Sequence, residues 1–69
     1  MITLDNIRKN IINAIAESPK TQKEIAAQIG VCPQAIGQYL HQNRLPALDT
    51  FAKLCVALDL DANEVLGIK

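Results

Sequence analysis

The stretch from residue 21 to residue 40, TQKEIAAQIGVCPQAIGQYL, constrains the fold most, because it predicts two helices joined by a very short turn. Thr21 and Glu24 have the spacing of a capping box, in which each side chain accepts a hydrogen bond from the other residue's backbone N–H. Gly30 suits the left-handed conformation that ends many helices. Pro33 suits the first position of a helix, where its missing N–H costs nothing. These signals predict helices over residues 22–29 and 33–42.

Apolar residues at helical spacing predict further helices on both sides of this stretch. The stripe before it predicts a helix over residues 4–16 and consists of Leu4, Ile7, Ile11 and Ile15. The stripe after it predicts a helix over residues 48–58 and consists of Leu48, Phe51, Leu54, Cys55 and Leu58. Asp61 and Glu64 have the spacing of a second capping box, which predicts a short helix over residues 62–66. The predicted fold is all-α, a compact five-helix bundle forming one domain over residues 1–69.

The composition narrows the class of protein. A chain of 69 residues makes one domain that buries only about 60% of the surface of its unfolded chain. The chain contains no run of about 18 apolar residues, the length that a membrane-spanning helix needs. Its first residues lack the pattern of a signal peptide. We therefore expect a cytoplasmic protein.

The reactive residues predict neither catalysis nor metal binding. The carboxylates are spread over caps and surfaces, no glycine-rich loop is present, and one His and two Cys do not make a zinc site. We expect no enzyme activity, cofactor or metal. Cys55 falls in a helix stripe and is predicted to be a small core residue. Cys32 stands at a helix N-terminus, where a thiolate is favoured; it is either a weak cap or a redox switch.

The distribution of charge matters more than its sum. The formal net charge is zero, which counts against nucleic-acid binding. Residues 18–46, however, carry Lys20, Lys23 and Arg44 against the single acid Glu24, whereas acids outnumber bases from residue 47 onward. Positive charge therefore gathers around the two central helices. The outer face of the second of these is polar, short and nearly uncharged, and its glutamines can pair with base edges.

The whole pattern resembles the helix-turn-helix of the Cro/CI-type phage repressors, the XRE family. The resemblance covers nearly the whole chain and is carried by Thr21-Gln22, Glu24, Ile25-Ala26, Ile29-Gly30-Val31, Ile36, Pro46 and the run from Leu54 to Leu58. It implies the five-helix fold of a phage-repressor DNA-binding domain with its helix-turn-helix core at residues 21–42. It also implies that the helix over residues 33–42 lies in the major groove of double-stranded DNA.

The resemblance further implies which residues contact DNA. The base-reading positions are Pro33, Gln34, Gly37 and Gln38. Pro33 can contact only apolar surface such as a thymine methyl, and Gly37 gives room for close approach. The expected phosphate contacts are Thr21, Gln22, Lys23, His41, Asn43 and Arg44.

Two functions follow as alternatives. The first is a sequence-specific, Cro/CI-like transcriptional repressor, prophage-type, that binds a palindromic operator as a homodimer. Apolar residues near the C-terminus supply the expected dimer surface, and some of them must belong to the core. They are Val56, Leu60, Val65, Leu66 and Ile68. The second is a protein-interaction module, such as an antitoxin or adaptor subunit, that uses the same fold to bind a protein partner. The chain is either a full regulator or one domain of a longer one.

Overall fold

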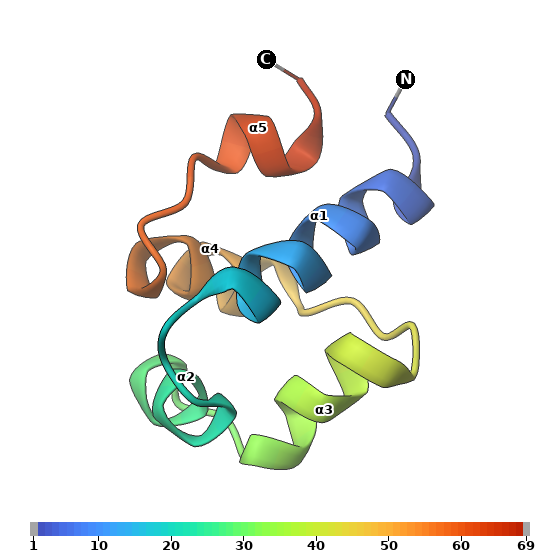
Figure 1. Cartoon of the computed structure of the whole chain (residues 1–69). Coiled ribbons are helices and arrows are strands. Elements are labelled where there is room, and N and C mark those ends of the chain that lie inside the picture. The colour runs from blue at the N-terminus through green and yellow to red at the C-terminus, as the bar shows by residue number, and fades with distance from the viewer. Residues whose placement is uncertain (1, 69) are drawn as a thin grey trace.

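The computed structural model describes residues 2–68 and contains five helices and no strand in this range (Figure 1). The helices are α1 (Leu4–Glu17), α2 (Gln22–Ile29), α3 (Pro33–His41), α4 (Leu48–Ala57) and α5 (Ala62–Leu66). The predicted all-α fold is confirmed. α2 and α5 have the predicted bounds, and the other three end one residue from the predicted position. Within the described range, no helix is long and apolar enough to cross a membrane.

The turn between α2 and α3 forms as the local sequence predicts. The Thr21 side chain accepts a hydrogen bond from the Glu24 N–H at 3.1 Å, and the Glu24 carboxylate accepts one from the Thr21 N–H at 3.2 Å. Gly30 ends α2 in the left-handed conformation at φ 75°. Cys32 precedes Pro33 as the N-cap of α3, and its side chain makes no capping hydrogen bond. It is therefore a cap in position only.

The core lies where α1, α2, α3 and α4 meet. Ile25, Ile36 and Leu54 are completely buried, one each from α2, α3 and α4. Cys55 lies in the core, as predicted, and Tyr39 lies there too. The other core residues are Ile11, Ile15, Ala26, Ile29, Phe51 and Val65.

Two residues of the predicted stripes are exposed. Leu4 is 62% exposed and Leu48 is 83% exposed. Each is the first residue of its helix, at the edge of the bundle, where no neighbouring helix covers it. The spacing of the apolar residues correctly predicted both helices, but it does not indicate where along each helix burial begins.

The bundle has two different ends (Figure 1). α2 and α3 lie together below α1 in this view, whereas α5 lies above it. α5 is joined to α1 by the Asn10 side-chain amide, which donates a hydrogen bond to the Val65 carbonyl at 3.0 Å. The helix-turn-helix therefore occupies one end of the molecule, away from α5.

Candidate nucleic-acid interface

α3 has one polar stripe and one buried stripe. Ile36 and Tyr39 face inward with exposed fractions of 0% and 6%. Gln34, Gly37, Gln38 and His41 follow each other at intervals of three or one residues, which places them on the opposite side of the helix. Gln34 and His41 are exposed, and Gly37 and Gln38 are partly exposed. Pro33 begins the helix and is also exposed. The predicted base-reading residues are therefore accessible on one face.

A hollow of about 440 Å³ lies beside this stripe, between α3 and the start of α4. It brings together Gln34, Gln38 and Arg44, of which the first two belong to the predicted base readers. The remaining lining residues are Val31, Cys32, Ala35, Tyr39, Leu45, Ala47 and Thr50. Thr50 is a polar residue that the sequence reasoning missed. Its signal was a hydroxyl in the first turn of α4, directly after the loop that carries Arg44.

The loop between α3 and α4 is held by contacts with α1 and α3. Asn43 has a left-handed backbone at φ 55°, a conformation that Asn tolerates better than most residues. Its carbonyl accepts a hydrogen bond from the Arg8 Nε atom of α1 at 3.1 Å. Arg8 is itself paired with the Asp5 carboxylate at 2.7 Å. Arg44, the next residue, donates from Nη1 to the Gln38 Oε1 atom at 2.7 Å. The loop is thus positioned relative to the outer face of α3.

The N-terminus of α2 carries the other three predicted phosphate contacts, Thr21, Gln22 and Lys23, and all three are exposed. The Thr21 oxygen accepts from the Glu24 N–H, so its hydroxyl proton stays available to a phosphate oxygen. Gln22 is the first residue of α2, and the N–H groups of a first turn have no partner within their helix. Because the helix dipole also favours an anion here, this end of α2 is chemically suited to a phosphate.

Comparison with known proteins identifies the domain. The family model described as helix-turn-helix matches residues 20–65. The chain belongs to the XRE-type helix-turn-helix family. It is also similar to the solution structure of the SOS-response transcriptional repressor LexA from Eubacterium rectale, with a TM-score of 0.77 and 27% sequence identity. That match covers 91% of this chain and 67% of the LexA chain. No curated protein sequence is significantly similar to the chain.

These similarities confirm the family and the fold that the resemblance implied. Family and fold are those of DNA-binding regulators, and together they support DNA binding and transcription regulation for this helix-turn-helix domain. The family match includes α2, the turn, α3, the following loop and α4. It therefore covers the face of α3, the hollow beside it and every predicted DNA-contacting residue.

Lys20 was counted from the sequence among the basic residues around α2 and α3, but its side chain is bound to other parts of the fold. Its Nζ atom donates to the Ala57 carbonyl at 2.8 Å and to the Gln28 Oε1 atom at 2.7 Å. Ala57 is the last residue of α4, where a cation is favoured by the helix dipole. Lys20 therefore stabilises the contact of the α1–α2 link with α4, and its Nζ atom is bound at the end of α4. Lys23 and Arg44 are the remaining cations of segment 18–46.

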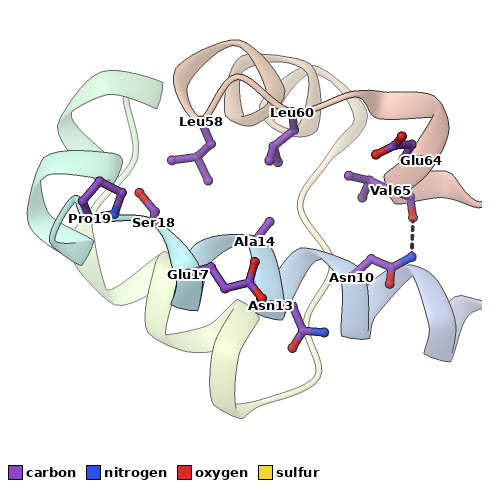
Figure 2. Close-up of a pocket in the computed structure, with 10 residues that line it drawn as sticks. All are labelled: Asn10, Asn13, Ala14, Glu17, Ser18, Pro19, Leu58, Leu60, Glu64 and Val65. Atoms are coloured by element: carbon purple, nitrogen blue, oxygen red, sulfur yellow. Dashed lines mark hydrogen bonds between the residues drawn. The ribbon is translucent and has the colours of Figure 1, made fainter.

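The opposite side of this domain has a second hollow of about 490 Å³. Figure 2 shows it between α1 and the connection from α4 to α5, with Leu58 and Leu60 facing Ala14 across it. Its polar side chains include Glu17 and Glu64, together with Asn10 and Asn13. No basic residue lines it, so it is unsuited to a DNA backbone. The separation of charge predicted from the sequence thus favours the α3 side.

The predicted dimer residues do not form one exposed surface. Val65 is only 7% exposed and belongs to the core, which corrects its prediction as a surface residue. α5 packs against α1, and the Asn10 side-chain amide donates a hydrogen bond to the Val65 carbonyl at this contact. Leu60 and Leu66 are partly buried against the same core. Val56 and Ile68 are exposed, at 82% and 59%.

The two cysteines have different surroundings. Cys55 is buried, and its burial together with the nearby Asp61 carboxylate raises the pKa of its thiol. Cys32 is exposed, lines the hollow beside α3 and has a free thiol. Within residues 2–68, no group of three or more His, Cys, Asp or Glu side chains is placed to hold a metal ion.

Proposed function

We propose that this helix-turn-helix domain is a sequence-specific transcriptional regulator that reads the major groove of double-stranded DNA with α3. The observation that carries the proposal is the outer stripe of α3, which stays accessible and polar while Ile36 and Tyr39 anchor the opposite side. Gln34 and Gln38 are its base readers, because glutamine side chains hydrogen-bond base edges in the major groove. Pro33 and Gly37 border them and admit close contact. The protein acts in the cytoplasm of a prokaryotic or phage-infected cell.

The phosphate contacts in this proposal come from both ends of the face. The start of α2 contributes Thr21, Gln22 and Lys23, while His41, Asn43 and Arg44 contribute from the other end. Only Lys23 and Arg44 of this set are permanently cationic, and each neutralised phosphate contributes about −0.9 to the slope of log K against log salt. A single domain therefore gives a shallow slope of about −2 on this reasoning, and its affinity is low.

Low affinity of one domain is the reason to propose a homodimer on a palindromic operator, with repression as the outcome. Two copies of α3 then enter successive major grooves about 34 Å, or about 10 base pairs, apart. Val56 and Ile68 are exposed apolar residues available to such a dimer, and Leu60 and Leu66 are partly exposed. Analytical ultracentrifugation on the selected duplex tests this part. A single domain bound per duplex at saturation contradicts the dimer.

The experiment that tests the function is selection from a random duplex library at low salt. We expect a two-fold symmetric motif with half-sites about one turn apart. Gln34→Ala then costs about 1–3 kcal/mol at one base position of that motif. Asn13→Ala is the matched control, since Asn13 is an exposed helical amide on the opposite side of the domain. An equal loss of affinity for the motif and for random DNA in Gln34→Ala would contradict base reading.

A specific observation also favours the second candidate function, a protein-interaction module. Exposed Leu4 and Leu48 border an apolar hollow of about 280 Å³ between α1 and the start of α4. Its other lining residues are Ile7, Ile11, Leu45, Pro46, Phe51 and Leu66. Contiguous exposed apolar surface is typical of protein interaction sites. Absence of any enriched duplex, together with a partner whose capture is lost in Leu48→Ser, would favour this function over DNA reading.

A further inference from the structure

The hydrogen bond between Arg44 and Gln38 determines how the Gln38 amide is oriented. A guanidinium has five donors and no acceptor, so only the oxygen end of the Gln38 amide can face it. The Nη1 to Oε1 distance of 2.7 Å is in the range of a charge-assisted bond, which is stronger than one between neutral groups. The Nε2 end of Gln38 is therefore the end that points away from Arg44.

Arg44 is kept in this place by its backbone as well as by its side chain. Its N–H donates to the Gln38 carbonyl at 3.4 Å. The preceding residue, Asn43, is bound through its carbonyl to Arg8 of α1 at 3.1 Å. Arg44 and Gln38 also line the same hollow beside α3. The pair is thus assembled before DNA arrives, and no reorganisation of the loop is needed to form it.

The orientation of the amide decides which bases it can read. The bidentate pair of glutamine with adenine needs Oε1 to accept from N6 and Nε2 to donate to N7. A cation on Oε1 draws electron density from the amide, which weakens that oxygen as an acceptor and strengthens the Nε2–H groups as donors. Gln38 then favours an acceptor on the base edge. Guanine N7 and O6, thymine O4 and adenine N7 are acceptors in the major groove. Adenine, however, places its N6 amino donor beside N7, and the Oε1 atom that would accept from N6 is already bound by Arg44.

We propose that Arg44 is a positioning residue that makes Gln38 select guanine or thymine instead of adenine. The inference deepens the proposed function and rests on it, because it concerns base reading by α3. It assigns Arg44 a role in specificity in addition to its phosphate contact. A phosphate contact alone leaves base preference unchanged, so the two roles are separable by experiment.

The test compares base preferences of the whole chain and its Arg44→Ala, Gln38→Ala and doubly substituted variants on selected duplexes. The position that loses its preference in Gln38→Ala identifies the base that Gln38 reads. We expect guanine or thymine there for the unsubstituted protein, and about a tenfold shift toward adenine in Arg44→Ala. In the Gln38→Ala background, Arg44→Ala should change no base preference.

Three outcomes of this test overturn the inference in distinguishable ways. If Arg44→Ala weakens all sequences alike and leaves the preference at the Gln38 position unchanged, Arg44 is only a phosphate contact and the proposed function stands. If the unsubstituted protein enriches no sequence, the proposed function fails and the inference fails with it. An adenine preference at that position in the unsubstituted protein also overturns the inference.

Circular dichroism shows whether Arg44→Ala still folds. If it does not, a second variant tests the same argument. Gln38→Glu keeps a partner for Arg44 but has only acceptor oxygens. We expect it to move the preference to cytosine or adenine, whose N4 and N6 amino groups are the donors of the major groove. Retention of guanine or thymine in Gln38→Glu would overturn the orientation argument.

Discussion

Substituting Gly37 with alanine adds one methyl group to α3. We expect this change to raise the stability of the domain and to lower its affinity for DNA. The Gly37 backbone is not left-handed, unlike those of Gly30 and Gly67, and a Cβ atom added to Gly37 meets nothing within 4 Å. Gly37→Ala therefore removes the helix penalty of glycine without strain, which raises the free energy of unfolding by about 0.5–1 kcal/mol. For a domain of this size, the melting temperature rises by about 2–8 °C.

The same methyl group should weaken DNA binding. It projects from the outer stripe of α3 between Gln34 and Gln38, where we expect base edges to come closest. We expect about a tenfold loss of affinity for the selected duplex, measured by titration beside urea unfolding of the free protein. Asn13→Ala is the control, since it improves helix propensity on the opposite side and should leave affinity unchanged. A more stable Gly37→Ala that keeps full affinity would refute the close approach.

Other predictions concern the core, the hydrogen bonds of Lys20 and the two thiols. Leu54→Ala should cost about 2–5 kcal/mol of stability in urea unfolding, whereas Leu48→Ser at an 83% exposed position should change it by no more than about 0.5 kcal/mol. Lys20→Met should lower stability by about 1 kcal/mol through lost hydrogen bonds and leave DNA affinity unchanged; a lower affinity with unchanged stability would place Lys20 on the DNA. The raised pKa of Cys55 means that its contribution to stability is complete below the ordinary thiol pKa and is lost as pH rises through the folded value. Cys55→Ala should remove that alkaline loss, and a thiol reagent should modify Cys32 before Cys55 in the native protein.

The elements that could be predicted from the sequence are those determined by neighbours along the chain. Thr21 with Glu24, Gly30 and Pro33 each act within a few residues, and together they gave the bounds of α2 and the start of α3. Their chemistry needs no knowledge of the rest of the fold, because caps and turns satisfy backbone groups of their own helix. The outer stripe of α3 was predictable for the same reason, since it follows from the apolar stripe on the opposite side.

The features that could not be predicted depend on contacts between distant segments. Leu48 has the spacing of a core residue, but its burial depends on whether another helix reaches the first turn of α4. Val65 is one of several apolar residues near the C-terminus, and the sequence does not say which of them α5 buries against α1. Periodicity identifies the face of a helix, whereas the length of the contact along that face is a property of the assembled bundle.

The roles of the charged residues also depend on contacts between distant segments, and this affects function. Lys20 and Arg44 contribute equally to a sum of charges near α3, yet the fold uses them differently. Lys20 binds a carbonyl at the end of α4, so its charge serves the packing of the bundle. Arg44 is exposed and reaches the Gln38 amide, so its charge acts where bases are expected. A neutral protein can therefore still present a cation at the point of recognition. In the proposed complex, that one cation matters more for which base is chosen than for how tightly DNA is held.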